Sequence, residues 1–422
     1  MYGLRRFGIK LGLDKMQNIL GDLGNPHNQY PCIHIAGTNG KGSVAASLSA
    51  ILHAAGYRVG LFTSPHLVKF NERICINSRQ ISDEQVVNAY EAVKTAGNAE
   101  REATFFEISA AMALYEFARQ QVDWAIVETG MGGRLDATNV VQPAVSIITN
   151  ISIEHKEYLG NTLAKIAAEK AGIIKSGVPV VTGVEQKSAR AVLETVANQK
   201  EAPLYRMGEA FRTRRTSDRE NRFTYFGTRH IWRNMKTRLI GDHQVKNAAI
   251  ALAACETLMA SQAVRLTEPV IRDGLLATRW PGRLEIVSRQ PLVILDGAHN
   301  LMAARNLGQF LRNSDILAGR EVTLVIGILD DKPWEAMLQS LVPPCKRVIL
   351  TQPEIDRALP AETLLPVVKK MAATVEIIPD VAEAVRRAIK TTADDAAVCV
   401  AGSLYVVGEA RDMLEQDGRL PR

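Results

Sequence analysis

The segment Gly37-Thr38-Asn39-Gly40-Lys41-Gly42-Ser43 has the residue types of a loop that binds nucleoside triphosphates. Glycines let backbone N–H groups wrap a phosphate, and a lysine can reach the outer phosphates. An apolar run precedes the loop and a helical pattern follows it, so a helix N-terminus adds positive potential. The segment departs from the strict GxxxxGK[ST] pattern, because Ser43 takes the hydroxyl position one residue late. We predict an ATP-binding loop; the alternative is a glycine-rich turn with a chance lysine.

Three further polar residues, Ser64, Glu128 and His155, each follow an apolar segment that we predict to be a strand. Ligands of open α/β sheets bind at the carboxyl ends of the strands, so these residues are candidates for one site. A hydroxyl, a carboxylate and an imidazole can hold Mg²⁺ when phosphate oxygens and waters fill the other octahedral positions. Taken alone, His155 is more often a helix-cap or core histidine than a ligand, and that alternative stays open.

Alternating strands and helices are expected to position these residues. Five short apolar runs are typical of parallel strands that are covered on both faces: 31–36, 58–62, 122–128, 144–149 and 178–182. Helical spacing or capping signals occupy the segments between them: 43–55, 82–96, 108–120 and 163–171. The pattern predicts an α/β fold with a doubly wound, mostly parallel sheet.

The pattern changes after residue 204. Residues 204–239 are rich in Arg, Thr and aromatics and predict β-hairpins added to the first domain, before a helix over 243–259. A second α/β series follows, with strands at 292–295, 322–326, 347–350, 375–378 and 397–401 and helices at 303–311, 334–341, 361–371 and 381–391. Pro and Gly interrupt both periods at 280–283. We therefore expect an N-terminal P-loop-type domain, 1–282, with a β-rich insertion, and a smaller C-terminal Rossmann-like domain, 283–422.

Composition excludes several classes of protein. The chain has 422 residues, of which 46% are hydrophobic and 23% charged, which argues against a disordered chain, a collagen or a coiled coil. No run approaches the ~18 apolar residues of a membrane helix, and the first residues lack the apolar core of a signal peptide. The five cysteines are far apart and predict reduced thiols in a cytoplasmic protein: Cys32, Cys75, Cys255, Cys345 and Cys399.

The positive charge is local. Between Tyr205 and Ile240 there are ten Lys/Arg and three acidic residues, which accounts for the whole net charge of +6. A protein that grips nucleic acid through its whole surface would not show this distribution, so we expect no nucleic-acid partner. The simplest interpretation of the stretch is a solvated face.

Further motifs occur in an order that resembles the Mur ligase superfamily, and specifically its folate branch, the folylpolyglutamate synthase/dihydrofolate synthase family. Residues 128–139 are similar to the E-x-G-x-G-G-x-x-D-x-T-N signature, and 296–300 resemble the D-G-A-H-N element. Shorter matches lie at 63–67, 153–155, 169–173, 241–247 and 402–405. The resemblance runs from Gly12 to Arg411, nearly the whole chain.

This resemblance implies an ATP-dependent ligase that joins L-glutamate to the carboxylate of dihydropteroate or a reduced folate through an acyl phosphate. It implies two Mg²⁺ sites that share Ser64, Glu128 and His155. It also implies that Lys170 is carbamylated and, as an anion, helps to hold a metal; the alternative is a solvated helix lysine paired with Glu169 or Glu154. The predicted catalytic residues are Lys41, Lys170 and His299.

The resemblance also assigns binding residues. It places Asn247 at the adenine, Arg283 at the phosphates and Asp296 on the ATP side. His299 and Ser403 follow strands of the second domain, where a glutamate or an acyl phosphate could be met. The pterin would be met by two segments: Gly12-Leu13-Asp14 and Thr104-Phe105-Phe106-Glu107. A flat pterin needs an aromatic wall and a carboxylate; the alternative for the second segment is a helix start with a core Phe pair.

Three other functions stay open. A peptidoglycan Mur ligase carries a UDP-binding domain ahead of the phosphate loop, and 36 residues before Gly37 are too few for one. A P-loop switch would need a guanine-specific element such as NKxD, which we do not find. A non-catalytic scaffold is disfavoured by the intact Lys41, Glu128, His155 and Lys170. We expect a cytoplasmic monomer that acts on small molecules without a membrane partner, and the basic stretch could attract anionic glutamate tails.

Overall fold

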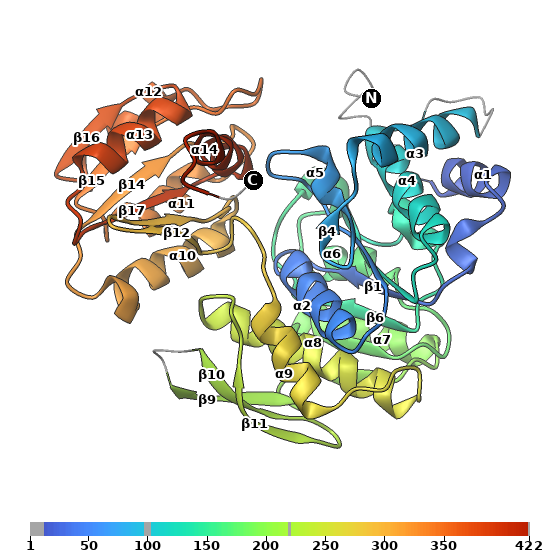
Figure 1. The fold of residues 1–422 in the computed structure, drawn as a ribbon. Helices are drawn as coiled ribbons and strands as arrows, with labels where there is room; N and C mark the ends of the chain where they lie inside the picture. The colour runs from blue at the N-terminus through green and yellow to red at the C-terminus, as the bar shows by residue number, and fades with distance from the viewer. Residues whose placement is uncertain (1–11, 97–102, 218–220, 421–422) are drawn as a thin grey trace. The chain divides into compact units, whose positions relative to one another are not determined.

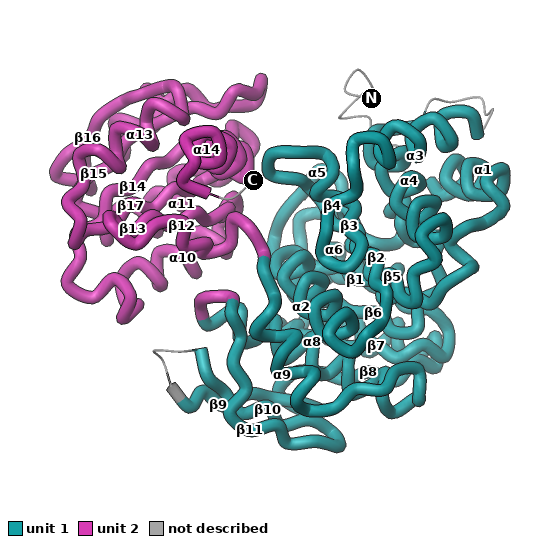
Figure 2. Tube along the Cα trace, viewed as in Figure 1, with its two compact units in different colours: residues 1–238, 242–279 teal, residues 239–241, 280–422 magenta. Residues whose placement is uncertain are grey.

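The computed structural model of the chain describes residues 12–96, 103–217 and 221–420 (Figure 1). The chain divides into two compact units (Figure 2). Unit 1 comprises residues 1–238 and 242–279, and unit 2 comprises residues 239–241 and 280–422. The division after Arg279 lies three residues before the expected end of the first domain at Gly282, and Leu239–Gly241 group with unit 2 although they precede α8 of unit 1.

Unit 1 is built on an eight-stranded sheet in the order β4-β3-β2-β5-β1-β6-β7-β8. Its strands are β1 Cys32–Ala36, β2 Val59–Phe62, β3 Ile74–Ile76, β4 Arg79–Gln80, β5 Trp124–Glu128, β6 Val145–Ile148, β7 Val180–Thr182 and β8 Leu204–Arg206. From β2 to β8 in that order the strands pair in parallel, and β3 and β4 pair antiparallel at the edge. The mostly parallel α/β sheet predicted from the sequence is therefore confirmed.

Helices cover both faces of this sheet. They are α1 Asp14–Asp22, α2 Lys41–Ala54, α3 Asp83–Thr95, α4 Phe105–Arg119, α5 Lys156–Leu159, α6 Leu163–Ala171, α7 Lys187–Gln199, α8 Asp242–Ala260 and α9 Glu268–Ala277. Side chains alternate along each strand. Ile33 and Ile35 of β1 therefore pack with α2, α8 and α9, whereas Cys32 packs on the other face with α1, α3 and α4, and Ala36 with α6 and α7.

Capping residues set the starts of two helices. Ser82 caps α3 in the predicted capping box, accepting from Gln85 N at 3.2 Å while Gln85 Oε1 accepts from Ser82 N at 2.8 Å. Helix α4 begins at Phe105, three residues before the expected start, because Thr104 and Glu107 form a second capping box. Helix α7 was not predicted, although its buried residues Ala189, Leu193 and Ala197 have amphipathic spacing.

The insertion after residue 204 contains hairpins, but it begins differently from the prediction. Strand β8 joins the main sheet in parallel with β7 and is not part of a hairpin. Three strands then form a separate antiparallel sheet in the order β11-β10-β9: β9 Arg212–Ser217, β10 Arg222–Phe226 and β11 Ile231–Lys236. One face of this sheet packs into the core with Phe223, Tyr225 and Trp232. β8 has only three residues, too few for the sequence to show a parallel strand.

Unit 2 is a six-stranded α/β sheet in the order β12-β13-β17-β14-β15-β16. The strands are β12 Glu285–Arg289, β13 Leu292–Leu295, β14 Val322–Ile326, β15 Arg347–Leu350, β16 Thr374–Ile377 and β17 Ala397–Ala401. The helices are α10 Leu301–Asn313, α11 Trp334–Leu341, α12 Ala361–Val368, α13 Val381–Thr391 and α14 Leu404–Gln416. All pairs are parallel except β12 with β13. Four strands have the predicted bounds, whereas β12 and α14 were missed.

Two expectations from composition concern the whole chain. In the described residues, no helix has both the length and the apolar character needed to cross a membrane. All five cysteines carry free thiols, and Cys75 differs from the other four because it is only partly buried.

Candidate active site

The predicted phosphate loop connects β1 to α2, so it lies at the carboxyl end of a central strand. Gly40 caps α2 in a left-handed conformation with φ +84°, and a Cβ there would stand 2.5 Å from Asn247 Oδ1. The segment after β6 holds the loop: Thr38 N donates to Asn150 O at 2.9 Å, and Asn39 N donates to Asn150 Oδ1 at 3.0 Å. The loop is thus fixed by its neighbours in the sheet before any ligand binds.

Three of the predicted residues come together at the carboxyl ends of the central strands: Lys41, Glu128 and Ser64. Strands β2, β5 and β1 are neighbours, and these residues follow their carboxyl ends or lie at them. Lys41 Nζ lies 3.7 Å from Glu128 Oε1. Glu128 Oε2 accepts from Ser64 N at 3.3 Å, and the Glu128 side chain is buried. A buried carboxylate beside an ammonium and a phosphate loop is suited to hold a cation with its bound nucleotide.

Lys170 reaches the same loop from α6. Its Nζ donates to Gly37 O at 2.9 Å, and the residue is 4% exposed. Burial and, secondarily, the charge of Lys41 lower the pKa of Lys170 to about 7. The side chain is therefore not a solvated helix lysine. Near neutral pH, a large fraction of it is the neutral amine, the form that can react with CO₂.

His155 and Asn247 come from two different helices, α5 and α8. His155 is the N-cap of α5 with φ +49°, and its Nε2 lies 3.8 Å from Glu154 Oε1. Its backbone caps the helix, but its side chain makes no capping hydrogen bond and is 40% exposed, so it is not a core histidine; its role as a metal ligand stays a prediction. Asn247 is buried on α8, where its Nδ2 donates to Gln244 Oε1 at 2.9 Å and its amide oxygen faces Gly40. The predicted adenine residue is thus placed against the phosphate loop.

A buried hydrogen-bond chain supports the loop that follows Glu128. Thr138 Oγ1 donates to Asp136 Oδ1 at 2.6 Å, and His34 Nε2 lies 2.8 Å from the same hydroxyl. Burial lowers the pKa of His34 to about 3, so its imidazole is neutral and Nε2 carries the proton that it donates to Thr138. Asp136 Oδ2 also accepts from Met131 N at 2.9 Å, although burial raises the pKa of this carboxyl. Sequence analysis missed His34, because a histidine inside an apolar strand gives no separate signal.

Within the predicted pterin segment 104–107, the structure separates Phe106 from the other three residues. Thr104 and Glu107 bond to each other's backbone: Glu107 N donates to Thr104 Oγ1 at 3.2 Å and Thr104 N donates to Glu107 Oε2 at 2.7 Å. Phe105 lies in the core under the Arg73 guanidinium, at 5.1 Å from the ring centroid. These three residues fit the helix-start alternative. Phe106 differs, because its ring packs against Gly130, two residues after the end of β5.

The other predicted pterin segment starts α1. Leu13 is the N-cap residue of that helix, Asp14 is its first residue, and Gly12 precedes them. Asp14 is exposed, whereas Gly12 and Leu13 are partly exposed. Their assignment to the pterin stays a prediction.

In unit 2, four predicted residues lie at the carboxyl ends of the neighbouring strands β13 and β17: Arg283, Asp296, His299 and Ser403. The Asp296 carboxylate accepts from Leu284 N at 2.9 Å and Ala298 N at 3.0 Å. Burial raises its pKa, and the charge of Arg283 acts in the opposite direction. The Gly297 carbonyl accepts from Arg283 Nη1 at 2.9 Å and lies 2.8 Å from His299 Nδ1.

Ser403 is a helix cap. It is buried at the start of α14, where its Oγ accepts from Tyr405 N at 3.1 Å. Asp296 and Ser403 therefore shape the backbone of the D-G-A-H-N element and of α14. Arg283 and His299 both bring a nitrogen to the Gly297 carbonyl, so the cation and the imidazole lie beside each other after β13.

The residues present fit a magnesium–nucleotide complex better than a cation bound by protein alone. Among the described residues, no group of three or more His, Cys, Asp or Glu side chains is placed to hold a metal. Glu128 with Ser64 offers a carboxylate and a hydroxyl, so phosphate oxygens and waters would have to complete the octahedron. This is the ligand set that Mg²⁺ adopts with nucleotides.

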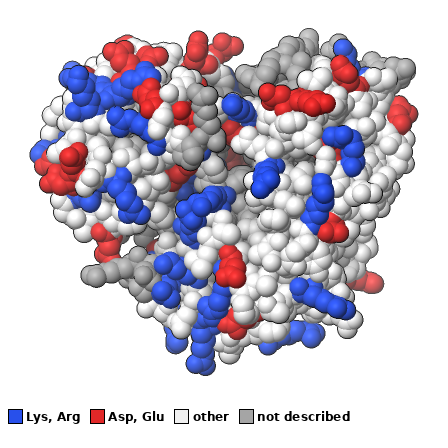
Figure 3. Space-filling view, in the orientation of Figure 1, with Lys and Arg blue, Asp and Glu red and all other residues white. Residues whose placement is uncertain are grey.

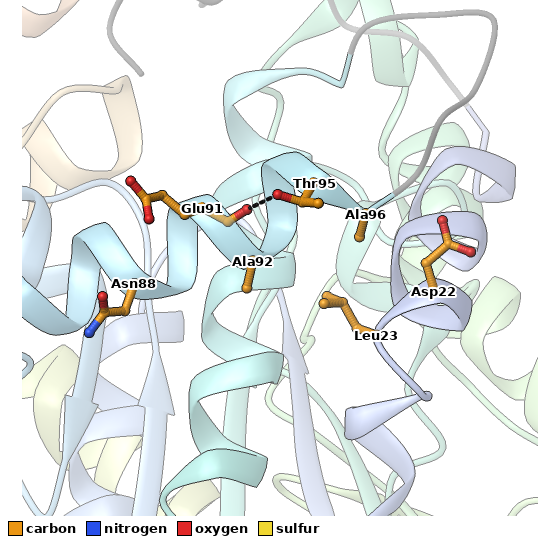
Figure 4. A pocket seen from close by; sticks show the side chains of 7 residues that line it. All are labelled: Asp22, Leu23, Asn88, Glu91, Ala92, Thr95 and Ala96. Carbon is orange, nitrogen blue, oxygen red and sulfur yellow. Dashed lines mark hydrogen bonds between the residues drawn. The ribbon is translucent and has the colours of Figure 1, made fainter.

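A separate cavity of about 660 Å³ lies between the end of α1 and α3 (Figure 4). Its carboxylates, Asp22 and Glu91, lie at opposite ends of it, and the Thr95 hydroxyl donates to Glu91 O within its own helix at 2.8 Å. None of the predicted site residues lines it, so it is not the nucleotide site.

Comparison with known proteins identifies the family. Residues 35–255 match the Mur ligase middle domain, and residues 282–404 match the Mur ligase glutamate ligase domain. The Bacillus subtilis dihydrofolate synthase/folylpolyglutamate synthase is 35% identical over 98% of this chain and 97% of its own length. The chain belongs to the dihydrofolate synthase/folylpolyglutamate synthase branch of the Mur ligases.

Solved structures of this folate-ligase branch have the same fold. Escherichia coli FolC in complex with DHPP and ADP is 31% identical, with a TM-score of 0.89 over 99% of this chain and 96% of that one. A bifunctional folylpolyglutamate synthase/dihydrofolate synthase with Mn, AMPPNP and L-glutamate bound is 31% identical, with a TM-score of 0.86 over 98% and 96% of the two chains. The resemblance stated from the motifs is confirmed.

Proposed function

We propose that the chain ligates L-glutamate to the carboxylate of dihydropteroate or a reduced folate, at the expense of ATP. The main support is that Glu128 and Lys170 both reach the predicted phosphate loop, Glu128 at Lys41 and Lys170 at the Gly37 carbonyl. Family membership supports the reaction class, since relatives are dihydrofolate and folylpolyglutamate synthases. Structures of relatives that hold DHPP with ADP, or AMPPNP with L-glutamate, support the substrates.

The reaction needs activation because a carboxylate is a poor electrophile. The γ-phosphoryl group of ATP passes to a carboxylate oxygen, which gives an acyl phosphate and ADP. The glutamate amine then attacks the acyl carbon, the carbon–oxygen bond to phosphate breaks, and phosphate leaves with the electron pair. The amine nitrogen releases a proton as the amide forms.

The phosphate loop stabilises the charge that moves during the first step. Backbone N–H groups of Gly40–Ser43, at the start of α2, and the Lys41 ammonium would contact the phosphates, and donors fixed in advance cost no reorganisation during reaction. Bonds from the Asn150 segment hold the loop in this shape. Asn247, packed at Gly40, is our candidate for the adenine contact.

Glu128, Ser64 and His155 are the residues that would hold magnesium. When bound, the ion would neutralise phosphate charge and orient the γ-phosphoryl group for transfer. The Glu128 carboxylate supplies the charge and the Ser64 hydroxyl supplies a neutral oxygen. His155 would be the ligand of a second site, and its partial exposure leaves it room to turn from Glu154.

Lys170 is our candidate for carbamylation. Its burial favours the neutral amine, which can add CO₂ and become an anion. The carbamate would stand beside the Lys41 ammonium, in place of the present hydrogen bond to Gly37 O. A positive neighbour stabilises the negative group, so the site would retain the modification.

The remaining residues are assigned to the two organic substrates and the nucleotide. Phe106 beside Gly130 offers an aromatic wall for a pterin. Arg283 and His299 offer a cation and an imidazole for an anionic phosphate or glutamate. We expect the enzyme to act as a monomer in the cytoplasm.

The decisive experiment measures ADP release with ATP, Mg²⁺ and L-glutamate, and with dihydropteroate or tetrahydrofolate in turn. We expect ADP release that depends on both glutamate and a pterin, with omission of glutamate as the control. Release with one pterin alone would define a monofunctional enzyme. A protein that binds ATP but releases no ADP with either pterin would refute the proposal.

A further inference from the structure

The small sheet β9–β11 has one apolar face and one cationic face. Phe223, Tyr225 and Trp232 point into the core of unit 1. Alternation along the strands puts their neighbours on the opposite face. That face carries the cations Arg212, Arg214 and Arg233 with two apolar side chains among them, Phe226 and Ile231. Blue side chains gather over this part of unit 1 in Figure 3.

The structure separates this face from the rest of the basic stretch. Arg206 forms ion pairs with Glu194 and Glu209, and Arg215 pairs with Asp242 at the start of α8. Within the described ranges, no carboxylate forms an ion pair with Arg212, Arg214 or Arg233. Arg219, with Asp218 and Glu220, lies outside the described residues.

The ring of Phe226 holds two of the guanidinium groups, those of Arg212 and Arg214, by cation–π contacts. The Arg212 guanidinium carbon lies 4.8 Å from the centroid of the Phe226 ring, and that of Arg214 lies 5.7 Å from it. A stacked guanidinium keeps its N–H groups for a planar anion, and its fork matches a carboxylate. Binding therefore costs less side-chain entropy here than on free lysines. The same stacking occupies the ring, so the face lacks an open platform for a nucleic-acid base.

The spacing of the face suits a chain of repeated carboxylates. Side chains two residues apart on a strand are about 6.6 Å apart, and neighbouring strands are about 4.8 Å apart. A γ-linked glutamate chain carries one free α-carboxylate per repeat, and five backbone bonds give a repeat of about 6 Å. Several carboxylates can thus contact cations of the face together.

The face is attached to the helix that reaches the phosphate loop. β9 is joined to α8 through Arg215 and Asp242, and Asn247 of the same helix packs at Gly40. These two positions of α8 are five residues apart, about 7.5 Å along the axis. A tail held on the face would stay near the reacting centre of unit 1 without occupying it.

We propose that the exposed face of β9–β11 is an exosite for the γ-glutamyl tails of polyglutamylated folates. This inference rests on the proposed function, because that function supplies a ligand with several carboxylates. The exosite raises the local concentration of long-tailed substrates and leaves the chemical step unchanged. Its contribution falls with added salt, since exposed charges are screened within ~8–10 Å at physiological ionic strength.

The test uses a probe without a pterin: tetra-γ-glutamate with a neutral fluorophore, followed by anisotropy with the full chain. We expect the triple variant R212Q/R214Q/R233Q to bind it about tenfold more weakly, since each exposed ion pair contributes little alone. A matched variant, K187Q/K369Q/K370Q, removes three charges at exposed positions elsewhere and should bind within about twofold of the parent. Arg233→Gln alone, expected about threefold weaker, keeps the test decisive if the triple variant does not fold.

Activity separates this inference from the proposed function. With a monoglutamyl substrate, ADP release by the triple variant should equal that of the parent, whereas KM for a tetraglutamyl substrate rises and kcat stays unchanged. Loss of ADP release in the parent with all substrates would refute the proposed function instead. Equal weakening in both triple variants, no weakening in either, or tighter binding of an oligouridylate than of the peptide would overturn the exosite.

Discussion

Replacing Lys41 by methionine tests the phosphate loop most directly, because methionine keeps the apolar stem and removes the charge. The Lys41 ammonium lies 3.7 Å from Glu128 Oε1 and 3.4 Å from Thr38 O, and the side chain is 15% exposed. Such a partly buried donor should act on phosphate charge with little screening. Loss of one preorganised donor costs about 3–4 kcal/mol of barrier, so we expect kcat to fall about 10²- to 10³-fold.

The same change should leave the chain folded. Glu128 loses a cation but keeps the hydrogen bond from Ser64 N. A buried acceptor that loses one partner costs about 1–3 kcal/mol, whereas folded domains are stable by about 5–15 kcal/mol. Lys41→Met should therefore melt a few degrees lower in calorimetry and still show native circular dichroism.

Single-turnover ADP formation at saturating ATP is the assay, with Lys187→Met as the matched control. Lys187 is exposed at the start of α7, so its replacement should change neither kcat nor the melting temperature. A folded Lys41→Met enzyme with kcat within about threefold of the parent would refute the role of this lysine at the phosphates.

Four further changes test other parts of the argument. Glu128→Gln keeps the shape but removes the charge that a divalent cation needs, so activity should collapse and return only partly at high Mg²⁺. Lys170 should gain the mass of CO₂ under bicarbonate, and Lys170→Ala should be inactive but partly rescued by acetate. His34→Phe removes the donor at the head of the buried chain to Asp136, which should cost about 1–3 kcal/mol in urea unfolding. Burial of Glu256 opposes its ionisation, but hydrogen bonds from the N–H groups of residues 228–230 outweigh burial and lower the pKa of Glu256 below 4.5. The stability that ionised Glu256 contributes is therefore complete above pH 4.5 and is lost as the pH falls through the lower pKa of the folded state. Glu256→Gln should abolish this pH-dependent loss.

Each of these tests has an outcome that contradicts it. An unchanged Mg²⁺ dependence would make Glu128 structural. An unmodified ammonium at Lys170 in an enzyme that is active under CO₂ would end the carbamylation proposal. Equal unfolding free energies would show that His34 contributes nothing to the loop after β5. If the unfolding free energies of the parent and of Glu256→Gln fall in parallel below pH 4.5, groups other than Glu256 dominate acid unfolding.

The sequence alone was sufficient for the elements whose signal is local. Parallel strands buried on both faces are continuous apolar runs, so β13, β14, β15 and β17 had the bounds that the structure shows. The phosphate loop was likewise visible, because its glycines, lysine and flanking strand and helix are contiguous. The family motifs added the reaction class, since their order along the chain is a property of the sequence.

For local patterns with two meanings, only the fold shows which contacts the side chains make. Thr104 and Glu107 have the spacing of a capping box and of a family motif, and both side chains bond to helix backbone in the structure. Arg212, Arg214 and Arg215 are indistinguishable as a basic run. Strand alternation sends Arg215 to Asp242 and leaves the other two stacked on Phe226.

Contacts between distant segments also required the tertiary structure. Lys170 is 133 residues from Gly37 in sequence, yet its ammonium reaches the Gly37 carbonyl, because α6 packs beside the strand that carries the phosphate loop. Its low pKa follows from that burial and from Lys41, neither of which is a property of the segment around it. The sequence by itself determined which chemical groups this protein has and on which elements they lie. The packing of the sheet decided which groups meet, because side-chain ionisation and reach depend on neighbours that the chain brings together only when it folds.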